Sequence, residues 1–266
     1  MIRFSANLST KFIFLVNSFK QLQKAFLTSI KQTPCLLCDE RTMNSTKICT
    51  PCSEDLPWNP DHCKYCALPA PIETRNFVCG ECIKAKPPFS KTISPFIYAF
   101  PINRLVQQVK YHRKQYWLTS LCDYLEQYIE QSYLMEDMPD FLVPVPMHKK
   151  KKRLRTYNQA ELIANKLSNR VSIPIQKGIL KKVKLTESQA SLNKADRLKN
   201  LRGSITLNLA LPAKKLEESL RNKHIAVIDD VMTTKATSEL VSKLLLDAGA
   251  NRVDIWCLAR TPKYRD

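Results

Sequence analysis

Eight cysteines near the amino end of the chain form four Cys-x-x-Cys pairs, a pattern that binds metal. Ten residues separate the first two pairs and twelve separate the last two. A Cys-x-x-Cys turn directs two sulfurs at one point, about 2.3 Å from a zinc ion, and a second pair completes the tetrahedron. We therefore expect two structural zinc ions, held by Cys35, Cys38, Cys49, Cys52, Cys63, Cys66, Cys79 and Cys82.

Two other uses of these cysteines remain alternatives. A disulfide framework would require export, and no cleavage site stands out near the amino end. An iron–sulfur cluster is the second alternative. The zinc pairing is either tandem, joining the first pair to the second and the third to the fourth, or cross-braced. His62 is expected to be a bystander, and Cys122 and Cys257 are expected to be core thiols because they stand among apolar residues.

A second stretch carries groups that suit a sugar phosphate. Residues 225–228 form an apolar run typical of a buried parallel strand, and we expect Asp229 and Asp230 to end it. Two adjacent carboxylates can accept hydrogen bonds from vicinal ribose hydroxyls. The following turn opens a helix, whose N-terminus can bind a phosphate; it consists of Thr233, Thr234, Lys235, Ala236 and Thr237. The alternative is that the acids only cap a strand and the hydroxyls only cap a helix.

A basic run follows another expected strand, at residues 141–147. Val145 and Pro146 belong to a constrained loop after this strand, and six cations in seven residues come next: Lys149, Lys150, Lys151, Lys152, Arg153 and Arg155. Such a loop would trap anions, although a solvated charge run is the simpler alternative. Asn158 is expected to begin the next helix, with Glu161 as its capping-box partner and with Ala160, Ile163, Ala164 and Leu167 on one face.

The remaining sequence supplies the elements that must position these groups. A chain of 266 residues can form one α/β domain with a small appendage. The net charge of +18 indicates a polyanionic partner such as nucleic acid, a phosphorylated metabolite or anionic lipid, or else a basic surface used for solubility. The apolar run at 12–16 is too short to span a membrane, so we expect an amphipathic helix there and a soluble, cytoplasmic protein.

The order of the motifs resembles the ComF family of competence proteins, in its ComFC branch. After the four cysteine pairs come Lys110-Tyr111, Val-Pro-Val-Pro at 143–146 and Tyr-Asn-Gln-Ala at 157–160. They are followed by Thr186-x-x-Gln189, Arg197-x-x-Asn200-x-Arg202-Gly203 and the Asp-Asp-x-x-Thr-Thr string. That string resembles the phosphoribosyl pyrophosphate loop of type I phosphoribosyltransferases, with Lys235 where that loop has glycine. If this position requires φ > 0, lysine costs about 1 kcal/mol there.

The resemblance covers residues 35 to about 260 and implies a doubly wound, mainly parallel α/β sheet behind a double zinc ribbon. The implied domains are an extension at 1–34, the zinc ribbons at 35–90 and a phosphoribosyltransferase-like domain at 91–266. Val145 and Pro146 would belong to the pyrophosphate loop. A variable region at 178–204 would add further cations beside the mouth of the site, namely Lys181, Lys182, Lys184, Arg197 and Arg202.

Three functions follow from the resemblance and the residues. The first is handling of incoming single-stranded DNA during natural transformation, alongside a competence helicase and recombination proteins, with Tyr111, Tyr157 or Trp117 stacking on bases. The second is an active phosphoribosyltransferase that binds phosphoribosyl pyrophosphate with magnesium. The third is a zinc-organised interaction module with a degenerate pocket.

Overall fold

The computed structural model describes residues 32–70, 76–112, 116–184, 203–208, 210 and 212–263. The chain divides into two compact units, Met1–Asp55 and Leu56–Asp266. The helix expected near residues 12–16 lies outside the described residues, and the domain boundaries expected after residues 34 and 90 stay predictions. No helix in the described part is long and apolar enough to cross a membrane.

The smaller unit is built around the first four cysteines. Strand β1 (Thr33–Pro34) pairs antiparallel with β2 (Arg41–Thr42), and the short helix α2 (Thr50–Glu54) follows. Pro51 stands in the first turn of α2, where proline's fixed φ suits a helix and its missing N–H has no partner to lose. Ile48 is fully buried, and within the described residues 32–55 the other buried apolar side chains are those of Cys35 and Cys49.

The larger unit is organised by a parallel sheet. Its strands are β3 (Thr92–Ile93), β4 (Phe96–Ile97), β5 (Phe141–Pro144), β8 (His224–Met232) and β9 (Arg252–Arg260). They lie in the order β3, β9, β8, β5, with β4 also against β9, and every pairing in this sheet is parallel. The central strand β8 has four fully buried residues, Ile225 to Ile228, because helices cover both faces of the sheet.

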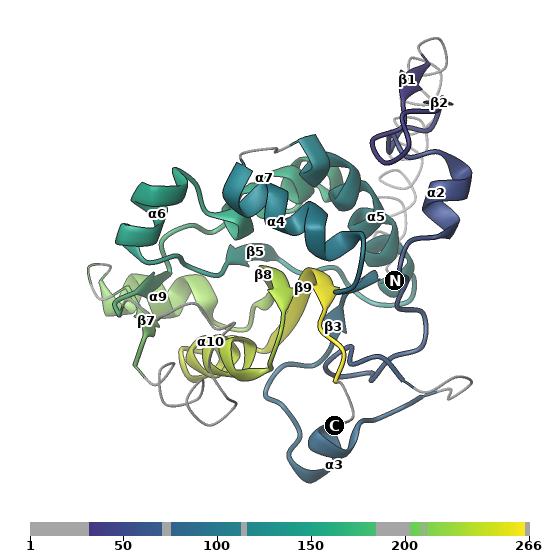
Figure 1. The fold of residues 1–266 in the computed structure, drawn as a ribbon. Coiled ribbons are helices and arrows are strands. Elements are labelled where there is room, and N and C mark those ends of the chain that lie inside the picture. Colours follow the sequence, from purple (N-terminus) through teal and green to yellow (C-terminus); the bar gives the residue numbers. More distant parts are fainter. Residues whose placement is uncertain are drawn as a thin grey trace, which may run out of the picture. The chain divides into compact units, whose positions relative to one another are not determined.

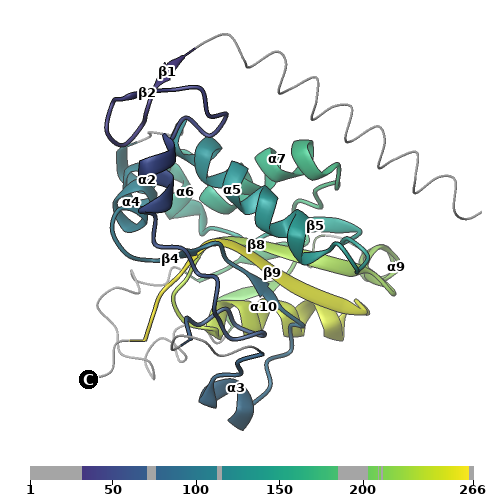
Figure 2. The same cartoon turned by 90° about the vertical axis from the view of Figure 1, so that its right-hand side faces the viewer.

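Helices lie on both faces of this sheet (Figures 1 and 2). On one face lie α4 (Ile102–His112), α5 (Tyr116–Ser132) and α7 (Gln159–Val171), while α10 (Ala236–Asp247) covers the other. The remaining elements are α3 (Gly80–Lys84), α6 (Lys149–Arg155), α9 (Ala213–Leu220) and an antiparallel pair, β6 (Leu180–Lys182) with β7 (Ile205–Leu207). The expected doubly wound, mainly parallel fold is confirmed.

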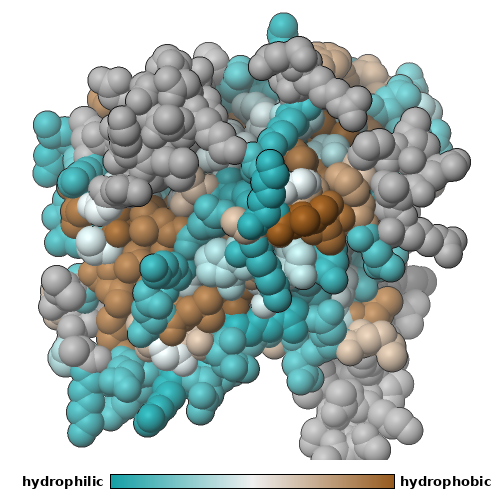
Figure 3. Space-filling model, turned by 90° about the horizontal axis from the view of Figure 1, so that it is seen from below, coloured by the Kyte–Doolittle hydropathy of each residue, from teal (hydrophilic) through white to brown (hydrophobic). Residues whose placement is uncertain are grey.

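The side of the sheet covered by α10 also carries α3 (Figures 1 and 2). Seen from below in Figure 3, this side of the molecule has apolar areas separated by bands of hydrophilic residues. Val241 and Leu245 of α10 are fully buried, as expected for the inward stripe of an amphipathic helix. Helix α10 therefore anchors the loop that precedes it to the sheet.

Helical periodicity explains the covering layer on the other face. In α5 the fully or almost fully buried residues recur at helical spacing: Leu118, Leu121, Cys122, Leu125 and Ile129. In α7 they are Ala160, Ile163, Ala164 and Leu167, which are the four residues expected from the sequence. Cys122 and Cys257 are core thiols as expected, and burial raises the pKa of each to about 12.

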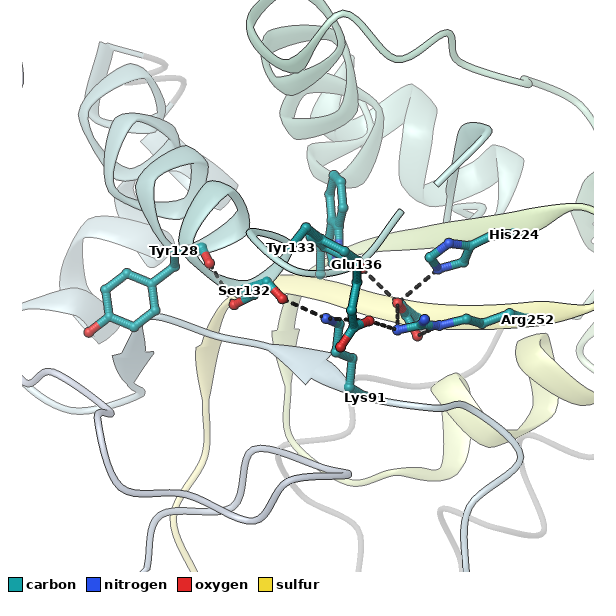
Figure 4. Close-up of polar contacts among 9 residues, drawn as sticks. Lys91, Tyr128, Ser132, Tyr133, Glu136, His224 and Arg252 are labelled. Atoms are coloured by element: carbon teal, nitrogen blue, oxygen red, sulfur yellow. Dashed lines mark hydrogen bonds and ion pairs between the residues drawn. The ribbon is translucent and has the colours of Figure 1, made fainter. Parts of the chain in front are cut away.

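A polar network fastens α5 to the amino ends of β8 and β9 (Figure 4). The fully buried Asp254 accepts hydrogen bonds from Tyr133 Oη at 2.6 Å and pairs with His224 Nε2 at 2.8 Å. Arg252 bridges Asp254 and Glu136. Burial opposes ionisation of Asp254, yet His224, Tyr133 and Arg252 hold its pKa below the ordinary value. This network lies at the amino ends of β8 and β9, whereas the acid pair lies toward the carboxyl end of β8.

Candidate functional site

The acid pair lies within strand β8 rather than after it. Asp229 faces Cys257 of β9 in the register, and the pairing continues to Met232 opposite Arg260. The expectation that Asp229 and Asp230 end the strand is therefore wrong, because β9 offers partners for three residues beyond the apolar run, namely Asp229, Val231 and Met232. The two carboxylates still stand near the carboxyl edge of the sheet, where ligands of open α/β sheets bind.

Two lysines from different elements interact with the acid pair. Lys110 Nζ of α4 lies 2.7 Å from Asp230 Oδ2, and this partner holds the lysine's pKa above its ordinary value although burial opposes the charge. On the other side, burial and the nearby Lys151 lower the pKa of Lys182, while Asp229 opposes that shift. From the sequence, Lys110 was predicted only as part of a motif and Lys182 only as a nucleic-acid contact.

Asp229 is poised to change its charge near neutral pH. Burial of its carboxyl and the neighbouring charge of Asp230 raise its pKa to about 7. Its Oδ1 accepts the backbone N–H of Asp230 at 2.9 Å, and Asp230 Oδ1 accepts that of Val231 at 2.8 Å. The two side chains are thus oriented by the strand itself, and such a shifted carboxyl in a polar cluster marks a functional-site candidate.

The phosphate loop, residues 233–237, joins β8 to α10. Thr233, Thr234 and Thr237 are partly exposed, and Ala236 is buried at the first position of the helix. Lys235 is the N-cap residue with φ −72°, so this position is not left-handed and the expected cost of lysine there does not arise. A 12-residue helix following the loop directs its positive dipole end toward residues 233–237.

The Lys235 side chain points away from the loop it belongs to. Its Nζ lies 3.7 Å from Cys82 Sγ, 3.4 Å from a Glu239 carboxylate oxygen and 4.0 Å from one of Glu81. These partners, above all Cys82, hold the pKa of Lys235 above its ordinary value against the effect of burial. The lysine is therefore bound to the second cysteine cluster, and it leaves the phosphate loop to its backbone and hydroxyl groups.

The turn after β5 is fixed by both the sheet and helix α7. Val145 N donates to Ile228 O at 2.9 Å, which brings this turn beside the acid-bearing strand. Asn158 is the N-cap of α7, as expected: its Oδ1 accepts from Ala160 N, and its Nδ2 donates to Val145 O. The expectation that Glu161 is the capping-box partner is wrong: its carboxylate instead accepts hydrogen bonds from Lys152 Nζ at 2.8 and 3.0 Å.

The basic run at 149–155 is a helix, α6, and not the expected loop. His148 caps it by accepting from Lys150 N, and Thr156 ends it with φ 68°. Lys149, Lys150, Lys152 and Arg153 are exposed, whereas Lys151 and Arg155 are partly buried. Lys149 and Lys150 each lie one turn before Lys152 or Arg153, so the helix concentrates positive charge on the surface.

The other predicted nucleic-acid contacts fall into three groups. Lys181 and Lys184 are exposed on or just after β6, while Lys182 is partly buried beside Asp229. Arg197 and Arg202 lie outside the described residues, as does the side chain of Tyr111. Tyr157 and Trp117 are 9% and 6% exposed, so the expectation that they stack on bases is wrong. Tyr157 instead donates its hydroxyl to Val109 O.

The eight cysteines form two closed clusters. In the smaller unit the sulfurs of Cys35, Cys38, Cys49 and Cys52 all lie within 4.8 Å of one another. In the larger unit the same holds for Cys63, Cys66, Cys79 and Cys82, which are all buried. The pairing is therefore tandem and not cross-braced.

The donor chemistry of both clusters fits structural zinc. Four thiols at this spacing leave no open position. Backbone N–H groups already point at the sulfurs, with Cys49 N donating to Cys35 Sγ and Cys79 N to Cys63 Sγ, each at 3.3 Å. The hydrogen bond from Cys66 lowers the pKa of Cys63 to about 4 despite burial, while the same contact and burial raise the pKa of Cys66. His62 is not a ligand, since its Nδ1 faces Asn59 O at 2.8 Å.

Comparison with known proteins agrees with this arrangement. A family model described as a double zinc ribbon domain matches residues 31–83. Competence protein F of Haemophilus influenzae is 29% identical over 80% of this chain and 90% of its own length. DNA utilization protein YhgH of Salmonella typhimurium is 28% identical over the same shares. A solved purine phosphoribosyltransferase from Pyrococcus horikoshii aligns with 56% of this chain and 86% of its own, at 18% identity and a TM-score of 0.33.

Proposed function

We propose, from the premise that this chain resembles the ComF family along most of its length, that it handles incoming single-stranded DNA during DNA uptake and natural transformation. The curated relatives are named for competence and DNA utilization. The observation that supports DNA contact is the exposed positive charge of α6, which stands beside the turn after β5 and the strand that carries Lys181.

The charges of α6 suit a nucleic-acid backbone better than a protein partner. Lys152 is engaged by Glu161, while Lys149, Lys150 and Arg153 are exposed. Each phosphate that such a cation neutralises releases a counterion, so binding to a single strand weakens with salt by a slope of about 0.7 per contact. Tyr157 and Trp117, two of the aromatic residues considered for stacking, are buried and would not add contacts to bases.

Charge substitutions on α6 test this proposal. The triple variant Lys149→Gln, Lys150→Gln, Arg153→Gln should bind a fluorescent oligothymidine more weakly and lower the salt slope by about 2. The control is Lys243→Gln on α10, an exposed lysine outside the proposed surface. An unchanged affinity and salt slope in the triple variant would remove α6 from the DNA surface.

The second candidate is an active phosphoribosyltransferase, favoured by the acid pair and its two neighbouring lysines, Lys110 and Lys182. Asp229 and Asp230 would hold the ribose hydroxyls, and residues 233–237 would hold the 5-phosphate at the start of α10. Val145 and Pro146 would line the pyrophosphate side. Magnesium would enter with the pyrophosphate, since the described residues place no third carboxylate or histidine beside the acid pair.

Ligand binding and turnover separate the two candidates. Calorimetry with phosphoribosyl pyrophosphate and magnesium should show binding that Asp230→Asn weakens, because Lys110 then loses its partner and the ribose loses an acceptor. Pyrophosphate release in the presence of nucleobases would establish turnover. Binding without release would leave a ligand-sensing pocket on a DNA-handling protein.

We also propose the cellular setting that the resemblance implies. The protein would act in the cytoplasm, after DNA entry, alongside a competence helicase and recombination proteins. A transformation assay comparing the α6 triple variant with Asp229→Ala, Asp230→Ala shows whether the DNA surface, the pocket or both are required. The zinc-organised interaction module is tested by capture of protein partners in the absence of nucleic acid.

A further inference from the structure

Two buried cations connect the second cysteine cluster to the phosphate loop. Arg260, at the end of β9, is 4% exposed and donates from Nε to Cys66 O at 2.9 Å. Its other donors reach Met232 O and Thr233 O, each at 2.9 Å. One guanidinium therefore holds a zinc knuckle and the first residue of the phosphate loop together.

Lys235 makes the second connection, from inside the loop. Its side chain is 9% exposed and its ammonium lies 3.7 Å from Cys82 Sγ. Glu239, one turn along α10, also contacts it at 3.4 Å. A buried ammonium is costly unless anionic groups compensate it, so the position of Lys235 depends on the charge of its neighbours.

Zinc bound in the second cluster would create the negatively charged centre that compensates the buried Lys235 ammonium. Zinc bound by four thiolates would give the centre a net charge of −2. Lys235 and Arg260 carry the opposite charge and lie next to this cluster, Lys235 at Cys82 Sγ and Arg260 at Cys66 O. Lys235 is itself a residue of the phosphate loop, and Arg260 binds the carbonyl groups of Met232 and Thr233, where the loop begins.

We propose that the Cys63–Cys82 zinc centre holds the phosphate loop in place through Lys235 and Arg260, so that zinc binding and phosphoribosyl-ligand binding favour each other. The ligand half of this inference rests on the pocket proposed above. Lys235 acts here as a positioning residue, which gives a physical reason for lysine at the position where the resembling loop has glycine. Coupling between two sites is reciprocal, so the ligand should slow zinc release as zinc tightens the loop.

Zinc release from the full-length protein tests the metal half without any ligand. With a colorimetric chelator, Lys235→Met should release one of its two zinc ions about tenfold faster than the parent, within the usual range for coupled sites. The matched control, Lys243→Met on the exposed face of α10, should release both at parental rates. Parental release of both ions from Lys235→Met would overturn the inference.

Hydrogen exchange and ligand binding test the loop half. Backbone amides of residues 233–238 should exchange faster in Cys82→Ser than in Cys52→Ser, which removes a ligand of the first centre instead. Equal exchange in the two variants would contradict coupling. In the parent, phosphoribosyl pyrophosphate should slow release of one zinc ion, and in Lys235→Met this effect should shrink. A parent that binds no phosphoribosyl pyrophosphate would refute the proposed pocket, while zinc release and exchange would still decide the coupling.

Discussion

The side chain of Asn158 donates from Nδ2 to the carbonyl oxygen of Val145 at 2.9 Å, so the first residue before α7 holds the turn after β5. The same side chain caps α7 through Ala160 N. A single amide therefore fixes both the helix start and the loop beside the acid pair. Neither task can be performed by an apolar residue.

Replacing Asn158 should separate these two tasks. Asn158→Ser keeps a capping oxygen but cannot reach Val145, so it should lower the free energy of unfolding by about 1 kcal/mol, the cost of one hydrogen bond. Asn158→Ala also loses the cap and should cost about 1 kcal/mol more. Urea unfolding followed by circular dichroism measures both. Equal stability of the two variants would show that the cap contributes nothing.

Asp229 should make stability depend on pH. An unfolded aspartate titrates near pH 4, roughly, whereas burial and Asp230 raise the pKa of Asp229 to about 7. Between these values the folded chain keeps a proton that the unfolded chain has released. The free energy of unfolding should therefore fall as pH rises through this interval and level off above it.

Asp229→Asn tests that pH dependence, because an amide cannot ionise. The variant should be more stable than the parent at pH 8 and nearly equal to it at pH 4.5. Asp137→Asn, an exposed residue in a loop, serves as the control. Urea midpoints at the two pH values give the comparison, and a constant difference between variant and parent would contradict the raised pKa.

Asp254 should be a major source of stability in the larger unit. Asp254→Asn leaves Arg252 and His224 without their buried anion and should cost about 3 to 5 kcal/mol. Because the pKa of Asp254 is lowered in the fold, its contribution is present above about pH 4 and is lost as the pH falls through the depressed value. Glu136→Gln, at a 43% exposed partner of Arg252, should cost less than about 1 kcal/mol. Chemical unfolding of both variants at pH 7 measures the contrast.

Removing a cysteine ligand from each of the two zinc centres should destabilise different parts of the protein. Cys49→Ser should reduce the zinc content from two ions to one and increase hydrogen exchange across residues 33–54, because the smaller unit has little core without metal. The larger unit should keep its unfolding midpoint. Cys79→Ser should also lose one ion but destabilise the larger unit, in which its cluster is buried. Zinc analysis with exchange mass spectrometry distinguishes the two results.

Local signals in the sequence predicted much of the fold. The cap at Asn158 and the four buried residues of α7 follow from helical spacing alone. The eight cysteines predicted both metal clusters, although their spacing left the tandem and cross-braced pairings open. The resemblance to the ComF family is confirmed by relatives named for competence and DNA utilization.

The errors came from partners distant in sequence. Asp229 and Asp230 remain in a strand because β9 pairs with β8 up to Met232, which the composition of the acid pair does not indicate. The direction of Lys235 depends on Cys82, 153 residues earlier in the chain. Burial of Tyr157 and Trp117 likewise depends on how α4, α5 and α7 pack. Local sequence patterns do not predict such long-range contacts.

The network around Asp254 has an evolutionary consequence. It secures the amino ends of β8 and β9 (Figure 4), whereas the acid pair, the phosphate loop and the turn after β5 lie toward the carboxyl ends of the strands. Substitutions at the carboxyl edge can therefore alter recognition while the scaffold keeps its own anchor. Lys235 in the phosphate loop is such a position: it has an ordinary right-handed φ of −72° and follows the carboxyl end of β8, whereas the Asp254 anchor lies at the amino end.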